Sequence, residues 1–216
     1  AGGPVRILKE TQPATLISRA GGYDPEKLDL EAINRKFDAA VKAGELQYTD
    51  ASWDCKVPNV GRWLRWRGGN AGHIHRINAH DSDGKTQLEL EARRSLLRLY
   101  RFLKKQPGLE GLTIESMSPE CGVRETATIV GRETVTVDDY VSGRVWDDAV
   151  CYSFYPIDLH TSDGNGIDQR ILSQGTVPTI PRGALLPRET CNLVAAGRCI
   201  SSDRLANSAL RVQATC

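Results

Sequence analysis

The sequence predicts an α+β fold, in which a mixed, largely antiparallel sheet packs against two main helices. Apolar residues recur at helical spacing in two long stretches, at 29–43 and 88–105. Most other segments are short β-type runs bounded by Gly or Pro. The chain has 216 residues, of which 40% are hydrophobic and 25% charged, which is the size and composition of a globular protein with a substantial core.

Each predicted helix has a recognisable boundary. The first, at 29–43, is followed by a glycine at the position of a C-terminal cap. The second, at 88–105, follows the capping-box sequence TQLE at 86–89 and stops before a Pro-Gly pair. Leu96 and Leu99 lie on its apolar stripe, so we expect both side chains to be buried.

The predicted strands are runs of β-branched and aromatic residues between turn signals. One helical turn is expected among them at 138–143, where Gly143 ends it. The run at 57–67 interleaves Arg with Trp, which indicates Arg stems packed on indole rings in a partly exposed sheet. The strand segments are 5–8, 15–17, 46–53, 57–67, 112–115, 126–130, 134–137, 146–159 and 176–186.

Charge and cysteine usage exclude several classes of protein. A net charge of +1 gives no electrostatic basis for binding nucleic acid or an acidic membrane surface. No apolar run approaches the roughly 18 residues that a membrane span needs. The six cysteines lie far apart without a CxxC pair, so we expect buried, reduced thiols and a cytoplasmic location.

The richest group of potential metal ligands is His73, His75, His80, Asp81 and Asp83. Two histidines at alternate positions of a strand would share one face, as a metal site requires. The segment 80–84 is instead typical of a turn, and it lacks the further oxygen ligands of an EF-hand loop. The sequence therefore predicts no metal site.

Four motifs occur in a fixed order along the second half of the chain. They are CGVRETATIVG at 121–131, DDYVSGR at 138–144, YPIDLH at 155–160, and NLVAAGRCIS at 192–201 with SALRVQATC at 208–216. Together they resemble a bacterial family of FAD-dependent oxidoreductases of the glutathione-reductase-type superfamily. The resemblance implies FAD as cofactor and hydride transfer between a small-molecule substrate and the flavin ring.

The resemblance draws attention to Arg124 and His160 as catalytic residues. Arg124 carries a permanent charge that suits a substrate carboxylate or the negative charge of reduced flavin. The alternative is a structural ion pair with Glu125 or an aspartate. His160 ends a predicted strand and suits proton transfer during hydride transfer, whereas the alternative is a surface histidine bonded to Asp158 or Asp163.

The C-terminal motif supplies the expected FAD contacts: Gly197, Arg198, Cys199, Ile200, Arg211 and Val212. Gly197 permits close backbone approach, and 211–212 would begin a helix whose free N–H groups face the flavin. Ordinary helix initiation is the alternative at 211–212. The sequence departs from the family pattern at 213–214 and at 181–184, which puts individual flavin contacts in question.

No GxGxxG turn between a strand and a helix occurs in the sequence, and the Gly-rich loop at 68–72 lacks suitable flanks. We therefore expect a substrate-side domain at 1–190 and a truncated FAD-contacting segment at 191–216, without the N-terminal dinucleotide-binding unit. A core strand is expected at 192–196. The helix after it, at 205–215, should be loosely held and expose Leu210, which would favour self-association.

Two other functions remain open at this point. One is a non-enzymatic ligand-binding or scaffold domain that retains the fold. The other is a flavin-independent hydrolase that uses Asp158, His160 and Asp163. By itself the chain is expected to be inactive and to hold no FAD, because pyrophosphate binding normally depends on the missing glycine-rich turn.

Overall fold

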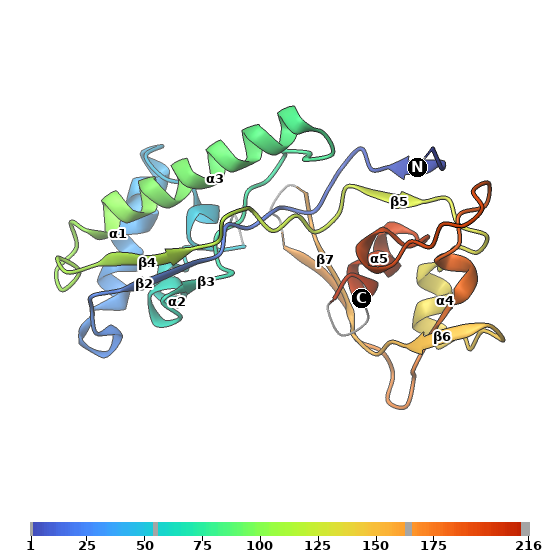
Figure 1. Cartoon of the computed structure of the whole chain (residues 1–216). Coiled ribbons are helices and arrows are strands. Elements are labelled where there is room, and N and C mark those ends of the chain that lie inside the picture. The colour runs from blue at the N-terminus through green and yellow to red at the C-terminus, as the bar shows by residue number, and fades with distance from the viewer. Residues whose placement is uncertain (1, 54–55, 163–165, 213–216) are drawn as a thin grey trace. The chain divides into compact units, whose positions relative to one another are not determined.

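The computed structural model describes residues 2–53, 56–162 and 166–212. The chain forms two compact units, each with its own hydrophobic core (Figure 1). Helices and small antiparallel sheets occur in both, which confirms the α+β class. Unit 1 comprises Ala1–Lys9, Arg124–Leu159 and Ile167–Cys216, and unit 2 comprises Glu10–Val123 and His160–Gly166.

In its described residues, unit 2 combines the α-helices α1, α2 and α3 with a three-stranded antiparallel sheet in the order β3-β2-β4. Gly68 has a φ of 97°, and a Cβ there would lie 2.5 Å from the carbonyl oxygen of Ser18, so β3 can pair with β2 only because this residue is glycine. The elements are β2 (Ser18–Gly21), α1 (Leu30–Lys42), α2 (Val60–Arg65), β3 (Gly68–Gly69), α3 (Ser82–Leu103) and β4 (Thr113–Met117).

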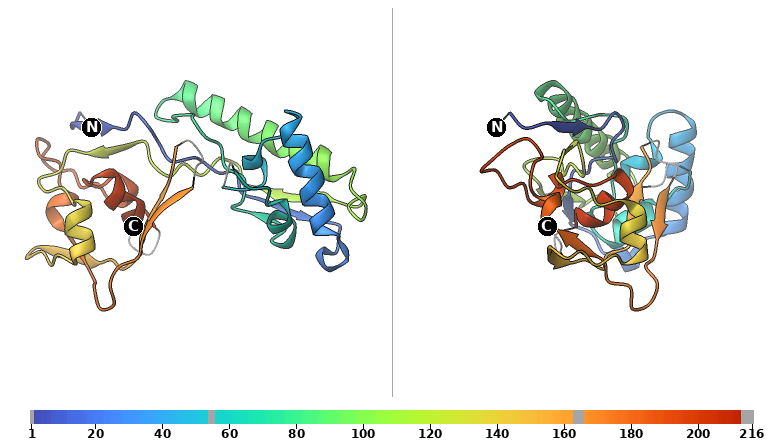
Figure 2. Two further views of the ribbon diagram at one scale, coloured as in Figure 1. Left: turned by 180° about the vertical axis from the view of Figure 1, so that it is seen from behind. Right: turned by 90° about the vertical axis from the view of Figure 1, so that its right-hand side faces the viewer.

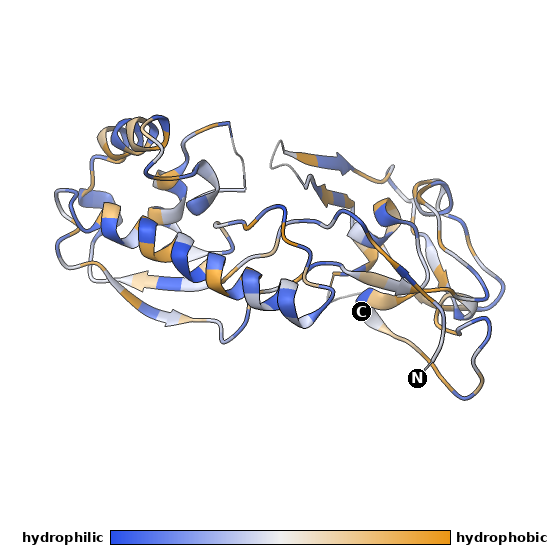
Figure 3. Ribbon diagram, turned by 90° about the horizontal axis from the view of Figure 1, so that it is seen from above, coloured by the Kyte–Doolittle hydropathy of each residue, from blue (hydrophilic) through white to orange (hydrophobic). Residues whose placement is uncertain are grey.

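Both predicted long helices are confirmed, with one changed boundary. The side chain of Asp29 caps α1 by accepting a hydrogen bond from the backbone of Ala32. The helix α3 begins at Ser82, six residues before the predicted start, because Asp81 is its N-cap. Figure 3 shows polar and apolar residues alternating along α3. Leu99 is fully buried as predicted, whereas Leu96 is only partly buried.

The β-type prediction for 57–67 is wrong, because most of this run forms the helix α2. Trp63 and Leu64 are both buried, which a strand with one exposed face would not allow but which neighbouring positions of a short helix can achieve. The predicted stacking of Arg on Trp does occur. The guanidinium carbon of Arg62 lies 4.3 Å from the ring centre of Trp53 and 5.1 Å from that of Trp66.

The prediction of a strand at 46–53 is also wrong. The chain forms a short 3-10 helix, Tyr48–Asp50, with a reciprocal capping box between Gln47 and Asp50. The backbone N–H of Gln47 donates to the Asp50 carboxylate at 2.9 Å. Local hydrogen bonding of this kind competes with strand formation.

The described part of unit 1 is built from short strand pairs and the short α-helices α4 and α5 (Figures 1 and 2). Within it, β1 pairs with β5 and β6 with β9, both antiparallel, and α4 contacts α5. The predicted helical turn at 138–143 is confirmed as α4, which ends at Gly143 with a φ of 75°. The elements are β1 (Val5–Ile7), β5 (Ala127–Ile129), α4 (Val137–Ser142), β6 (Ala149–Tyr152), β7 (Ile157–His160), β8 (Ile167–Arg170), β9 (Thr179–Pro181) and α5 (Arg204–Leu210).

The C-terminal segment differs from its prediction. No strand forms at 192–196, where Asn192 has a φ of 57° and Val194 is 64% exposed. The helix α5 is not loosely held, because its small residues and Leu210 pack into the core of unit 1. Leu210 is 1% exposed, so the apolar surface on which we based self-association is absent from this helix. The remaining part of the predicted helix, at 213–215, lies outside the described residues.

Candidate functional site

A cavity of about 520 Å³ opens in unit 2. Such a volume is in the range of small-molecule sites. Apolar side chains form part of its wall, and the rest is polar or charged. The polar residues that matter for the chemistry are Tyr48, Asp50, His73, His75, Arg76 and Glu91.

Asp50 forms a fixed, charged wall of this cavity. The residue is 3% exposed to solvent. Its carboxylate accepts hydrogen bonds from Ser95 Oγ at 2.6 Å and from Arg98 Nη2 at 2.8 Å. Arg98 Nη2 also donates to Glu91 Oε1 at 3.0 Å. Burial opposes ionisation of Arg98, but its bonds to Asp50 and then Glu91 raise its pKa overall. Both carboxylates are therefore held in place by one guanidinium group.

His160 lies beside two other histidines of unit 2. Its ring is edge-on to that of His73, with 4.8 Å between the ring centres, and His73 lies 6.0 Å from His75. The backbone N–H of His160 donates to Gln12 Oε1 at 3.1 Å, which fixes the end of β7. His73 is 2% exposed and lines the cavity. The fold thus brings the predicted catalytic histidine to a pair of residues considered from sequence only as metal ligands.

The other members of that ligand group have structural roles. His80 Nε2 lies 3.3 Å from Asp81 Oδ2, and the second oxygen of Asp81 caps α3 by accepting from Gly84. Within the ranges that the structure describes, no three His, Cys, Asp or Glu side chains are grouped as metal ligands.

Arg124 belongs to a group of charged side chains within unit 1. Glu125, its predicted alternative partner, is buried and pairs with Arg204 Nε at 2.9 Å. Arg211 donates to the backbone oxygen of Asp158 at 3.1 Å and lies 3.9 Å from its carboxylate. Burial, and next the nearby charge of Arg211, lower the pKa of Arg124 to about 10. Among the described residues, the guanidinium groups of Arg124, Arg204 and Arg211 thus lie near the carboxylates of Glu125 and Asp158.

Two of the residues named in the hydrolase hypothesis, Asp158 and His160, have other contacts in the structure. Asp158 is engaged by Arg211, and its backbone N–H donates to Ser208 Oγ at 3.1 Å. His160 packs on His73. Asp163 lies outside the described residues.

The expected cofactor contacts form a turn in unit 1. Gly197–Cys199 is a short 3-10 helix with a φ of 80° at Gly197, and Arg198 and Cys199 are exposed whereas Ile200 is buried. Beneath it, Asn207 Nδ2 donates to the backbone oxygen of Arg198 at 3.1 Å. Asn207 is 1% exposed, and its Oδ1 has no hydrogen-bond partner among the described residues.

These features fit a cofactor with N–H or O–H donors beside the turn. An unpaired buried acceptor is costly, and a bound donor would satisfy it. Arg211 is the C-cap of α5 and Val212 follows it, so neither begins a helix within the described residues. The side chain of Arg211 turns toward Asp158. Within this set, the turn is therefore exposed to solvent at Arg198 and Cys199, whereas the side chain of Arg211 is engaged by Asp158.

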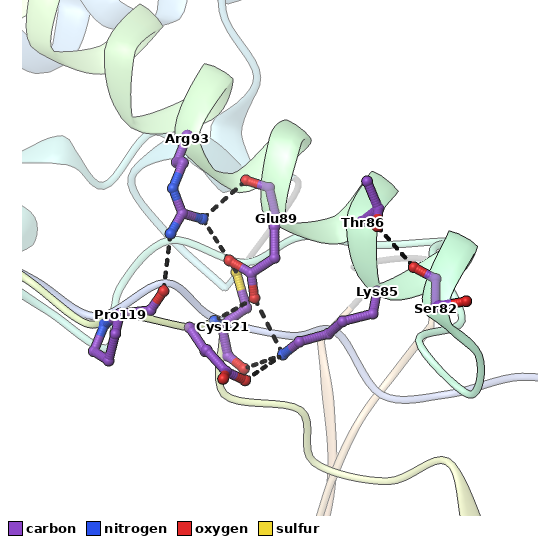
Figure 4. Close-up of polar contacts among 8 residues, drawn as sticks. Ser82, Lys85, Thr86, Glu89, Arg93, Pro119 and Cys121 are labelled. Carbon is purple, nitrogen blue, oxygen red and sulfur yellow. Dashed lines mark hydrogen bonds and ion pairs between the residues drawn. The ribbon is translucent and has the colours of Figure 1, made fainter.

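A polar network holds the start of the CGVRE motif on α3 (Figure 4). Glu89 accepts a hydrogen bond from the backbone N–H of Cys121 at 2.8 Å and pairs with Lys85 at 3.1 Å and with Arg93. Arg93 in turn donates to the backbone oxygen of Pro119 at 3.0 Å. The segment 119–121 is therefore tied to one face of the helix.

This network also decides the chemistry of Cys121. Burial, and then the adjacent Glu89, raise the pKa of the Cys121 thiol to about 12, so it is protonated at neutral pH and unsuited to act as a nucleophile. The expectation of a buried thiol is confirmed here. It is wrong for Cys191 and Cys199, which are exposed free cysteines.

Comparison with known proteins identifies the family. A family model described as FAD dependent oxidoreductase matches residues 3–216. No curated protein and no solved structure matches the chain. None of the helices in the described part is long and apolar enough to cross a membrane. Because the family model covers almost every residue, the chain belongs to the FAD-dependent oxidoreductase family, whose enzymes use FAD as cofactor.

Proposed function

We propose that this chain supplies the substrate side of hydride transfer between a small molecule and FAD in the complete enzyme. The supporting observation is the contact of His160 with His73, a buried residue on the wall of a 520 Å³ cavity. In this proposal 1–190 handles the substrate and 191–216 contacts FAD, as in the glutathione-reductase-type superfamily. The exposed free thiols of Cys191 and Cys199 support a reducing, cytoplasmic location.

The reaction requires a proton acceptor at the substrate. When bound, FAD supplies the two-electron chemistry. A substrate that gives up hydride from carbon also releases a proton from its hydroxyl or amino group, and imidazole is suited to accept it near neutral pH. We assign this step to His73 at the cavity wall, with His160 packed against it as the second group of a proton relay.

Charged groups of unit 1 have a separate role in this proposal. Arg124 is partly buried close to a second guanidinium group, that of Arg211, and such an environment stabilises added negative charge. We therefore assign Arg124 to stabilising negative charge on the cofactor side. The turn at Gly197, Arg198 and Cys199, with Ile200 behind it, is assigned to direct contact with FAD. Arg211 and Val212 support this region from the end of α5.

The test is the rate of flavin bleaching by substrate in the complete, FAD-containing protein. His160→Asn should slow bleaching by about 10²–10⁴-fold while leaving substrate affinity unchanged, because the change removes the group to which His73 passes the proton and does not alter the cavity wall. Added imidazole should restore part of the rate. His80→Asn is the matched control, since His80 lies outside the cavity wall and pairs with the exposed Asp81.

Two results would count against the proposal. Bleaching by the His160→Asn protein at the rate of the unmodified enzyme would remove His160 from the proton relay. A protein that binds ligands in the cavity but never bleaches its flavin would favour the non-enzymatic binding function.

A further inference from the structure

We infer that the cavity of unit 2 binds a zwitterionic ligand with an apolar side chain, of the chemical class of the aliphatic amino acids. This inference names a substrate class for the site proposed above and rests on that proposal for its catalytic meaning. It is carried by two charged groups of opposite sign on the wall of one cavity, Glu91 and Arg76, together with an apolar part of the same wall.

On one part of the cavity wall, acidic side chains outnumber the basic side chain that pairs with them. Asp50 and Glu91 share one guanidinium group, that of Arg98, so these three side chains carry a net charge of −1. The Asp50 carboxylate is fully engaged by Ser95, Arg98 and a backbone N–H. Glu91 uses Oε1 for Arg98, and its Oε2 has no protein partner among the described residues. That oxygen is the available acceptor for an ammonium group.

The positive side is Arg76. Arg76 is exposed and lines the same cavity. It forms no ion pair with any carboxylate in the described part of the chain. A guanidinium group offers two parallel N–H donors that match both oxygens of a carboxylate. Arg76 is therefore suited to bind the carboxylate of a ligand whose ammonium group lies at Glu91.

The remaining wall selects the rest of the ligand. Val41, Leu46 and Ile74 line the cavity and present hydrocarbon surface. A hydrocarbon side chain placed there gains about 25 cal/mol per Å² of apolar surface removed from water. Lined in this way, the cavity favours an amino acid with an aliphatic side chain over a short polar one.

The balance of charges on the cavity wall disfavours ligands that carry only positive or only negative charge. Asp50, Glu91, Arg98 and Arg76 sum to zero, with the negative excess and the positive group on different side chains of the wall. A simple anion would meet the unneutralised carboxylate, and a simple cation would leave Arg76 without a counter-charge. A ligand that carries both charges satisfies both groups at once, which is the basis of selectivity here.

Titration calorimetry on the full chain tests this with three probes of the same shape. They are leucine in both enantiomers, 3-methylbutylamine, which lacks the carboxylate, and 4-methylpentanoate, which lacks the ammonium group. Removing one charge-assisted contact should weaken binding by about 10- to 100-fold, so both analogues should bind that much more weakly than the better enantiomer of leucine.

Two variants locate the contacts. Arg76→Gln should weaken leucine by about 10- to 100-fold and leave the amine unchanged. Glu91→Gln should weaken leucine and the amine and leave the carboxylate probe unchanged, while its retained amide oxygen can still accept from Arg98. Arg94→Gln is the control, because Arg94 is an exposed arginine of α3 outside the cavity wall. It should bind all three probes normally.

The inference is overturned if either analogue binds unmodified protein as tightly as leucine, or if Arg76→Gln leaves leucine affinity unchanged. The probe comparison needs no variant, so it holds even where Glu91→Gln unfolds the chain. Binding is measured without FAD and thus separates the two proposals. Leucine that binds without bleaching the flavin of the complete enzyme would leave the ligand class intact and count against leucine oxidation.

Discussion

The carboxylate of Glu89 joins two parts of the chain that are 32 residues apart. It binds the backbone of Cys121 while two basic side chains of its own helix, Lys85 and Arg93, flank it. Burial opposes its ionisation, but the hydrogen bond from Cys121 and then the bonds from the basic residues lower the pKa of Glu89 to about 2. The folded state is therefore stabilised by the charged form of Glu89.

This predicts acid sensitivity at one position. The stabilisation from Glu89 is fully present above its ordinary pKa of 4.5 and is lost as the pH falls from there toward 2. Glu89→Gln should lower the free energy of unfolding at pH 7 by about 1.5–3 kcal/mol and flatten the pH dependence in that window. Urea unfolding at several pH values measures both effects.

The control is Glu31→Gln on α1, whose side chain is 93% exposed and pairs only loosely with Arg35 at 3.9 Å. It should change stability by less than about 0.5 kcal/mol. Equal pH profiles for unmodified and Glu89→Gln protein would show that the network does not couple protonation to folding.

Among the secondary-structure elements, α3 carries one buried and one exposed leucine close together, so the effects of truncating each can be compared. Leu99 is fully buried in the core of unit 2, whereas Leu97, two positions away, is 44% exposed. Leu99→Ala should cost about 2–5 kcal/mol in the free energy of unfolding because it leaves a cavity. Leu97→Ala should cost less than about 0.5 kcal/mol. Urea unfolding that ranks the two variants in the opposite order would contradict the assigned buried face.

The elements that the sequence predicted correctly are those with local signals. The periodicity at 29–43 and the Gly143 cap depend on near neighbours and appear as α1 and α4. The stretch at 57–67 was misassigned because Val60, Trp63 and Leu64 are buried by contacts far along the chain, which override intrinsic preference. The N-cap of α3 was missed for a related reason: Asp81 was considered as a ligand and not as a cap.

The candidate site shows the same division. The motif YPIDLH pointed to His160, but nothing local in the sequence indicated that His160 would meet His73. A pairing across 87 positions is a property of the tertiary fold. Glu91 and Arg76 carry no motif at all, and only their shared cavity brings them to notice. An HxH pattern at 73–75 was the one available signal, and it was weighed only as a possible metal site, which the sequence did not favour.

For the whole molecule, the separate cores predict a local response to mutation. The core of unit 1 contains Leu210, and the core of unit 2 contains Leu99. Leu210→Ala should therefore speed amide hydrogen exchange mainly in unit 1, and Leu99→Ala mainly in unit 2, because each removes packing within one cooperative region. Exchange followed by mass spectrometry on the full chain resolves the two patterns. Val194→Ala, at a 64% exposed position of unit 1, should leave both patterns unchanged. If Leu210→Ala instead accelerated exchange equally across 10–123 and 124–159, the two cores would unfold as one unit, and each substitution would have to be understood as acting on the stability of the entire chain.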